Sequence, residues 1–254
     1  MFDLHSHILY GIDDGARTIG ESFIMLESAA RRNIKGVVAT PHFDFSVNID
    51  EFLKERDFKI DKLKKMLELA ELDVTLYGGA EVLVSDDVFF MNDLDRLTIN
   101  NSRYLLIEFE FKKDLSINRI ISYIDEIKKQ GLIPVVAHPE RYYFFQKSYD
   151  FLNILVQNGA ILQVNATSFL DEAPQNEFRL AAQLVSQRIA SVIASDAHSF
   201  KGRSNKHLAN REIYPNEIKP DHIFNRFVEY VPSAIINNED IPEHEKGVLI
   251  KKFF

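Results

Sequence analysis

The sequence predicts an α/β protein, best described as a closed barrel of TIM type with seven strands rather than eight. Short, almost continuously apolar segments alternate in regular order with longer amphipathic segments. Regular alternation favours parallel strands joined by crossover helices, and unbroken apolar strands are typical of sheets covered on both faces. The length of 254 residues suits one such domain over residues 1–254. An open doubly wound sheet is the alternative.

Seven short apolar segments are the strand candidates. The first is the opening FDLHSH at residues 2–7, in which His5 and His7 would share one face because strand side chains alternate. The other six are GVVATPH (36–42), VTLYGGAEV (74–82), YLLIEF (104–109), LIPVVAHPE (132–140), AILQVNA (160–166) and IASVIASDAH (189–198).

The segments between these strands have the spacing of amphipathic helices. Residues 18–33 place apolar side chains three and four residues apart, after Thr18 as a candidate N-cap and a glutamate at the capping-box position. Gly36, Gly131 and Gly159 follow predicted helices, as expected of C-terminal signals. The remaining predicted helices cover residues 50–71, 116–130, 147–158 and 173–188.

Composition excludes several classes of function. Lysine and arginine number 30 against 38 acidic residues, and the most basic segment, residues 53–66, has acids interleaved, so we expect no nucleic-acid partner. No apolar run reaches about 18 residues, so no membrane insertion is expected. Cysteine is absent, which excludes disulfides, thiolate metal ligands and cysteine nucleophiles. The first residues lack the pattern of a secretory signal, and a cytoplasmic location is expected.

Polar residues stand at the C-terminal end of nearly every predicted strand. Five of the eight histidines lie there. In an α/β barrel these ends meet at one rim, where active sites are built. The residues concerned are His5, His7, His42, Glu81, Glu108, His138, Asn165, Asp196 and His198.

Each of these residues alone also has an ordinary structural explanation, such as a helix cap, a loop residue or a buried histidine bonded to a carbonyl. Together they favour a metal cluster, because ionisable groups near a barrel core are costly unless paired or metal-bound. Histidine and carboxylate without sulfur suit Mn, Fe, Zn or Co. The set is too large for one ion, and it predicts two or three divalent ions with a bridging carboxylate. We expect the remaining histidines at the surface: His207, His222 and His244.

The motifs DLHSH, TPH, GAE, EF, AHPER and SDAH resemble, in this order, those of the PHP (polymerase and histidinol phosphatase) superfamily. GIDDG directly after H-x-H, the chain length and HPER are similar to one branch, the CpsB/CapC-type or YwqE-like bacterial protein-tyrosine phosphatases of capsule and exopolysaccharide loci. The resemblance covers residues 1 to about 210. It implies a distorted (β/α)7 barrel with three metal ions, usually manganese.

The resemblance also implies how the ligands divide among three positions. For the first position the implied ligands are His5, His7, Glu81 and Asp196. For the second they are Glu81, Glu108 and His138, with Glu81 bridging. For the third they are His42, His198 and Asp14, with Asp13 as the less favoured choice.

Two arginines match positions at which the family binds phosphate. Arg141 lies in HPER and Arg203 follows SDAH. Ser199 and Ser204 stand where the family usually has asparagine and proline, so the sequence leaves the direction of Arg203 open.

The function implied is metal-dependent hydrolysis of a phosphomonoester by hydroxide formed at the ions near neutral pH. A tyrosine leaving group has a pKa near 10, so a general acid is less essential, although His42 or Asp14 could assist. We expect a protein-tyrosine phosphatase acting on the phosphotyrosine tail of a bacterial tyrosine kinase. The alternatives are a histidinol-phosphate or other small-molecule phosphatase, a PHP nuclease or proofreading domain, and a non-catalytic metal-binding regulator.

Overall fold

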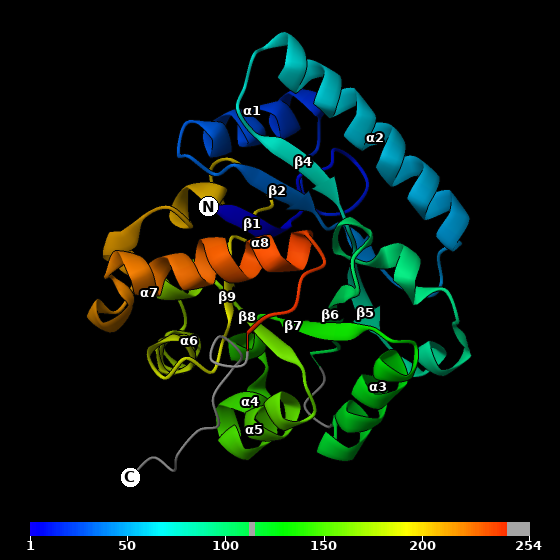
Figure 1. Cartoon of the computed structure of the whole chain (residues 1–254), viewed down its shortest axis with the longest axis vertical. Coiled ribbons are helices and arrows are strands. Elements are labelled where there is room, and N and C mark those ends of the chain that lie inside the picture. The colour runs from blue at the N-terminus through cyan, green and yellow to red at the C-terminus, as the bar shows by residue number, and fades with distance from the viewer. Residues whose placement is uncertain (112–114, 243–254) are drawn as a thin grey trace.

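The computed structural model describes residues 1–111 and 115–242, and its strands are parallel (Figure 1). A three-stranded sheet has the order β1 (Phe2–Ser6), β2 (Gly36–Ala39), β4 (Thr75–Gly78). A six-stranded sheet has the order β3 (His42–Phe43), β5 (Glu81–Val84), β6 (Tyr104–Phe109), β7 (Ile133–Ala137), β8 (Ile161–Asn165), β9 (Val192–Ala194). The predicted α/β fold with parallel strands is confirmed.

Two of the seven predicted strands are each divided in two. The predicted strand at 36–42 becomes β2 and β3, and the one at 74–82 becomes β4 and β5. The break in the first follows from Pro41, which has no N–H to donate to a ladder. Its neighbour is interrupted at the same level, yet the Gly79 N–H still donates to the Ala39 carbonyl at 2.9 Å. The strands β2 and β3 therefore follow each other along the chain, and β4 and β5 do the same beside them.

The first and last strands are also joined. The Asp196 N–H donates to the His5 carbonyl at 2.9 Å, and the His7 N–H donates to the Ala197 carbonyl at 2.8 Å. With this link, backbone hydrogen bonds connect neighbouring strands all the way around a ring. Such a ring favours the barrel over the open sheet.

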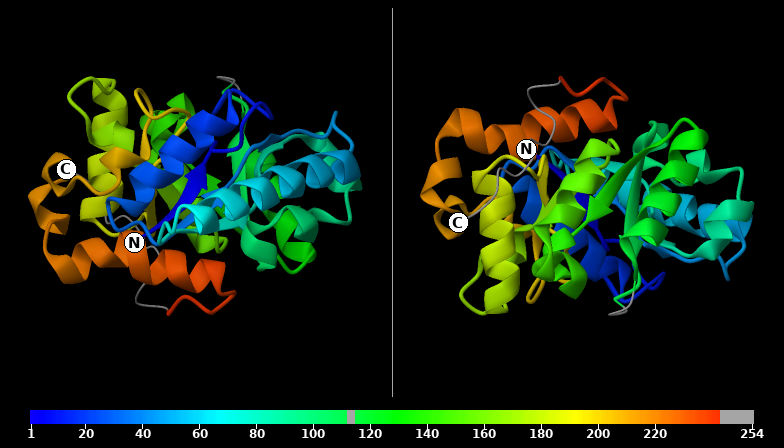
Figure 2. Two further views of the ribbon diagram at one scale, coloured as in Figure 1. Left: turned by 90° about the horizontal axis from the view of Figure 1, so that it is seen from above. Right: turned by 90° about the horizontal axis from the view of Figure 1, so that it is seen from below.

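The strands bury both faces, as their apolar composition predicts. Leu4, Val38, Leu106 and Val135 belong to a cluster inside the ring. The alternate residues of the same strands belong to a larger cluster between the strands and the surrounding helices. Figure 2 shows these helices arranged around the outside of the strands.

The helices follow the predicted order with shifted ends. Thr18 accepts a hydrogen bond from the Glu21 N–H at 3.2 Å, so the predicted N-cap is confirmed. Gly131 and Gly159 have the positive φ of helix C-terminal signals, whereas Gly36 lies in β2. The helices are α1 (Ile19–Ala30), α2 (Ile49–Leu69), α3 (Ile117–Lys129), α4 (Tyr143–Lys147), α5 (Tyr149–Gln157), α6 (Gln175–Ser186), α7 (Asp221–Asn225) and α8 (Val231–Ile236).

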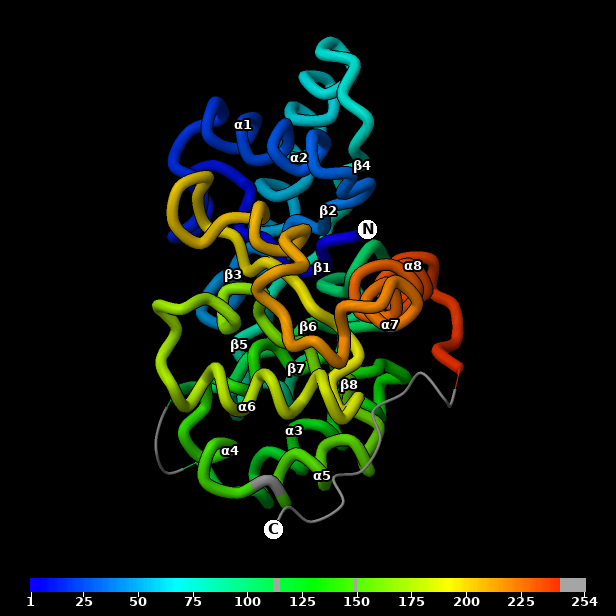
Figure 3. The backbone as a smooth tube through the Cα atoms, turned by 90° about the vertical axis from the view of Figure 1, so that its left-hand side faces the viewer, coloured from blue at the N-terminus to red at the C-terminus, as the bar shows by residue number. Residues whose placement is uncertain are grey.

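Three of these helices, α4, α7 and α8, were not predicted from the pattern. A π-helical turn, Arg226–Tyr230, joins α7 to α8. Val231 and Ile235 of this region pack into the cluster inside the ring, and α8 lies beside β1 (Figure 3). The C-terminal helices therefore cover the ring at the end where β1 begins, and leave the opposite rim free for polar residues. The assignment of residues 1–254 to one domain stays a prediction.

Candidate metal centre

The structure brings the nine predicted metal ligands together at the rim formed by the C-terminal strand ends. His5 lies in β1, Glu108 in β6, and His42 and Glu81 begin β3 and β5. The others stand in the connections that follow strands: His7, Asp14, His138, Asp196 and His198. Of the remaining histidines, His222 is exposed as expected, His207 is half-buried, and His244 lies outside the described residues.

The deepest part of the cluster is formed by the two histidines of the opening motif. Their Nε2 atoms are 3.1 Å apart, and each lies 3.2 Å from the Oε2 of Glu81. Asp196 Oδ1 lies 3.5 Å from His5 Nε2 and 3.4 Å from His7 Nε2. A register shift between Asp3 and Ser6 lets β1 direct both Leu4 and the histidines inward, which strict alternation would forbid.

A second group surrounds the other side of Glu81. His138 Nε2 lies 2.9 Å from Glu81 Oε1, while His42 Nδ1 lies 3.1 Å from Glu81 Oε2 and 3.2 Å from Glu108 Oε1. Both oxygens of Glu81 are therefore engaged, each by different histidines. This is the arrangement required of a carboxylate that bridges two cations.

The third group lies nearest to solvent. Asp14 Oδ1 is 3.2 Å from His198 Nε2 and 3.4 Å from His42 Nε2. His42 thus presents one ring nitrogen to this group and the other to Glu81. The donor atoms of His7, Asp14, His42 and His198 all lie within 4.8 Å of one another.

Asp13 and Asp14 have different partners. Asp13 Oδ2 lies 2.7 Å from His7 Nδ1 and accepts a hydrogen bond from the His42 N–H at 3.1 Å. Asp13 Oδ1 accepts from the Gly15 N–H. A Cβ at Gly15 would lie 2.0 Å from the His7 carbonyl oxygen, so the close turn needs glycine. Asp13 is therefore placed to fix the His7 ring, and Asp14 is left to face the cluster.

Replacing Asp13 with asparagine is expected to weaken metal binding by about 10- to 100-fold, the usual cost of losing a carboxylate that orients a ligand histidine. Manganese titration of Asp13→Asn against wild type measures this. Asp73→Asn is the matched control, because Asp73 is an exposed acid that forms an ion pair with Lys35. Equal affinity in Asp13→Asn and wild type would contradict the orienting role.

A buried amide chain supports the ligands from below. His5 Nδ1 lies 2.8 Å from Gln163 Oε1, Gln163 Nε2 donates to Asn165 Oδ1 at 2.9 Å, and Asn165 Nδ2 donates to Asp196 Oδ2 at 2.8 Å. Asn165, which the sequence placed at the rim, thus holds Asp196 in position. Gln163 was missed, although it is a polar residue two positions before Asn165 on the same face of an apolar strand.

The donor atoms fit divalent cations. Glu81 Oε2 is buried within 3.2 Å of three imidazole nitrogens but has hydrogen-bond geometry with none of them. Burial alone would lower the pKa of His42, but the adjacent carboxylates of Glu108 and Glu81 raise it to about 10. Burial alone would raise the pKa of Glu81, but the surrounding histidines hold it well below its usual range. The carboxylates therefore favour positive charge here, and a bound cation would displace protons from the imidazoles.

The two predicted arginines reach the same carboxylate. Arg203 Nη1 lies 2.9 Å and Arg141 Nη1 3.4 Å from Asp196 Oδ2. The N–H groups of His198 and Ser199 both bond the Arg203 carbonyl, at 2.9 and 3.0 Å, and so fold this loop back toward the cluster. The loop with Ser199 and Ser204 therefore directs Arg203 to the site.

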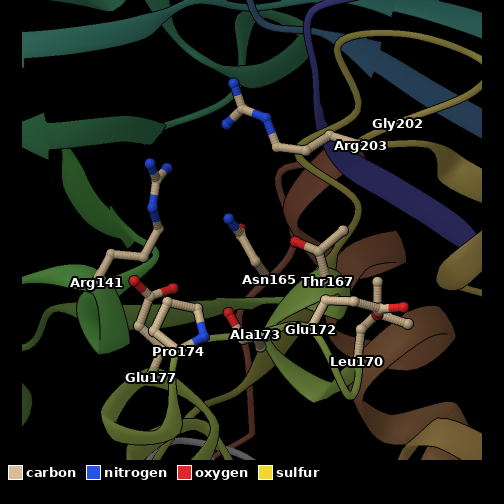
Figure 4. A pocket seen from close by; sticks show the side chains of 11 residues that line it. Arg141, Asn165, Thr167, Leu170, Glu172, Ala173, Pro174, Glu177, Gly202 and Arg203 are labelled. Carbon is tan, nitrogen blue, oxygen red and sulfur yellow. The ribbon is translucent and has the colours of Figure 1, made fainter.

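A cavity of about 380 Å³ adjoins these arginines. Figure 4 shows Arg141 and Arg203 extending from opposite sides of it, with Asn165 between them. Leu170, Pro174 and Glu177 also line the cavity. The cavity and the cluster thus share the two guanidinium groups.

Comparisons with known proteins agree with this geometry. Residues 1–224 match the model of the CpsB/CapC family, whose description is "Capsular polysaccharide synthesis, CpsB/CapC". The putative tyrosine-protein phosphatase CapC of Staphylococcus aureus is 31% identical over 247 residues, which cover 97% of this chain and 92% of that protein. The tyrosine-protein phosphatase YwqE of Bacillus subtilis is 31% identical over 207 residues, which cover 80% of each.

Solved structures give the same picture. A structure from the pair YwqE of Bacillus subtilis and CpsB of Streptococcus pneumoniae, named as unique metal-dependent tyrosine phosphatases, superposes with a TM-score of 0.84. Its identity is 26%, and the match covers 99% of this chain and 100% of that one. A putative histidinol phosphatase of Listeria monocytogenes, with a TM-score of 0.51 and 12% identity, shares the fold. Among the described residues, no helix is long and apolar enough to cross a membrane.

Proposed function

We propose that this chain, which belongs to the CpsB/CapC family of capsular polysaccharide synthesis, dephosphorylates the phosphotyrosine tail of a bacterial tyrosine kinase. Its activity is that of a metal-dependent tyrosine phosphatase. The observation that carries the proposal is the meeting of two arginines with a nine-residue cluster of histidines and carboxylates at one rim. The cluster would hold two or three divalent ions, and manganese is the proposed metal, with iron, zinc or cobalt as alternatives that suit the same donors.

Divalent ions held by the cluster would neutralise phosphoryl oxygens and lower the pKa of a bound water. The side chains organise this chemistry. Glu81 contacts both of the deeper groups, and Asp13 fixes the ring of His7. His42 and Asp14 face each other on the solvent-exposed side of the cluster. His42 and Asp14 are the residues proposed to assist departure of the tyrosine oxygen, whose low basicity makes that assistance a small contribution.

Arg141 and Arg203 are the proposed phosphate ligands. In the protein alone both contact Asp196, which offsets part of their combined positive charge at the mouth of the site. A phosphoryl group offers two oxygens to each planar guanidinium, so the forks can turn from the carboxylate to the substrate. Both arginines also line the cavity, so a phosphoryl group bound between them would lie where the cavity and the cluster meet.

Arg141→Ala and Arg203→Ala are each expected to lower kcat/KM by about 10- to 100-fold, because a charge-assisted contact contributes about 1.5–3 kcal/mol and 1.4 kcal/mol is tenfold. Metal content should stay unchanged, and inorganic phosphate should inhibit less. Arg179→Ala, an exposed arginine of α6, is the control. Wild-type kinetics in both site variants would reject the proposed phosphate contacts.

The substrate class is tested by comparing kcat/KM of the manganese-loaded protein on a phosphotyrosine peptide from a kinase tail and on histidinol phosphate. Metal content is measured on the same samples. The proposal expects clear preference for the peptide. Preference for histidinol phosphate would favour the small-molecule alternative. A cytoplasmic location stays a prediction of the sequence.

A further inference from the structure

Phe111 is an exposed aromatic residue beside the metal centre to which the chemistry above gives no role. It follows β6, two residues after the strand ends, and 54% of it is exposed. Its ring stacks on the buried ring of Tyr142, with centroids 4.8 Å apart at 21°. It also lies parallel to the His138 ring, at 6.0 Å and 19°.

These contacts hold the ring at the edge of the proposed phosphate position. The guanidinium carbon of Arg141 lies 5.1 Å from the centroid of Phe111. The same Arg141 contacts Asp196, and His138 contacts Glu81. Single exposed phenyl rings are common and need no role. Phe111 differs because each of its aromatic partners belongs to the rim or directly supports it.

We propose that Phe111 is a specificity residue that packs against the phosphotyrosyl ring while Arg141 and Arg203 bind the phosphate. This inference rests on the proposed function and deepens it. In phosphotyrosine a single ester oxygen separates the phosphorus from the aromatic ring. When Arg141 binds the phosphate, the substrate ring therefore lies close to Phe111, which is next to Arg141. Aromatic pairs interact in offset or edge-to-face geometry at centroid distances of about 4.5–7 Å.

The cavity offers a second place for the substrate ring, which the charges disfavour. Its wall contains Leu170 and Pro174 but also the carboxylates of Glu172 and Glu177. Neither carboxylate has a hydrogen bond or ion pair within residues 1–111 and 115–242. A phenyl ring in the cavity would remove water from them without providing a partner, which is costly. The exposed face of Phe111 carries no such penalty.

The test compares Phe111→Ala, Phe111→Leu and Phe111→Tyr, using a phosphotyrosine peptide, phenyl phosphate and inorganic phosphate as an inhibitor. Phe58→Ala is the matched control, because Phe58 lies on α2 and is 57% exposed, close to the value for Phe111. Leu170→Ala tests the cavity. All variants are assayed as full-length, manganese-loaded protein.

We expect Phe111→Ala to raise KM for both aromatic substrates by about 3- to 10-fold, the range given by aromatic pair energies, with the inhibition constant of phosphate unchanged. Phe111→Leu should resemble Phe111→Ala, Phe111→Tyr should resemble wild type, and Phe58→Ala should have no effect. A parallel rise in the phosphate inhibition constant would show instead that Phe111 acts by orienting Arg141, and would overturn the inference.

Two further results would overturn it. One is an unchanged KM in Phe111→Ala, and the other is a rise in KM in Leu170→Ala alone, which would place the ring in the cavity. Both leave the proposed function intact, because wild type still hydrolyses the peptide. Failure of wild type to hydrolyse either aromatic substrate would remove the proposed function itself, and the inference with it.

Discussion

Glu81→Ala is expected to abolish phosphatase activity and to lose more than one bound ion. The Glu81 side chain is almost fully buried, one oxygen lies within 3.2 Å of three imidazole nitrogens, and the other lies 2.9 Å from His138 Nε2. A ligand shared by two positions cannot be lost from one of them alone. Because bound ions contribute several kcal/mol to phosphoryl transfer, kcat/KM should fall by at least about a thousandfold.

Metal analysis by mass spectrometry, together with kcat/KM on a phosphotyrosine peptide, measures this effect. His5→Ala is the informative comparison, because His5 Nε2 contacts the deepest group, and the loss of His5 should reduce metal binding mainly there. Glu68→Ala, at an exposed position of α2, should match wild type. Circular dichroism must accompany these measurements, since removing one partner of a buried charge pair can cost about 3–5 kcal/mol of stability. A folded Glu81→Ala with the wild-type number of ions would disprove the bridge.

Exhaustive chelation is expected to have an equally large effect. The nine clustered residues are histidines and carboxylates that would hold divalent cations, and such cations would generate the hydroxide nucleophile from a bound water. Treatment with EDTA should therefore reduce hydrolysis of the phosphotyrosine peptide to background. Restoring manganese should restore activity, and the same addition should raise Tm, because an ion that binds only the folded protein at about 100 times its Kd adds about 2.7 kcal/mol of stability.

The chelation experiment includes its own control. Protein treated with EDTA and then returned to buffer without metal separates loss of ions from irreversible damage, because only the manganese arm should recover. Zinc, iron and cobalt added in parallel would rank the metals. Full activity in a sample that mass spectrometry finds free of metal would contradict the metal-dependent mechanism.

Several features of the fold followed from local sequence patterns. The positions of the strands were predicted because buried parallel strands are short apolar runs, and these runs do not depend on distant residues. The cap at Thr18 was equally local. The division of two strands was not predicted, although Pro41 was visible, because its effect depends on the strand that pairs beside it. The helix α8 was missed because its partners lie inside the ring, on strands far away in the chain.

The gathering of His5, His7, Glu81, Glu108 and Asp196 could be expected from the sequence, since the ends of parallel strands meet at one rim whatever the details of packing. The division of labour among these and nearby residues was decided by tertiary structure. Asp13 and Asp14 are adjacent and chemically identical, and only the turn at Gly15 sends one to His7 and the other to His198.

The direction of the Arg203 side chain was likewise decided by tertiary structure. Its loop is folded by backbone hydrogen bonds from His198 and Ser199 to the Arg203 carbonyl. Gln163 became important only because its amide meets His5 from a strand 158 residues away. Phe111 has no motif, and its relation to Arg141 exists only in three dimensions. The sequence by itself determined which donor types reach the rim, because strand period and strand order are local and topological properties. Tertiary structure decided which atom faces which, because side-chain direction depends on contacts between segments far apart in the chain.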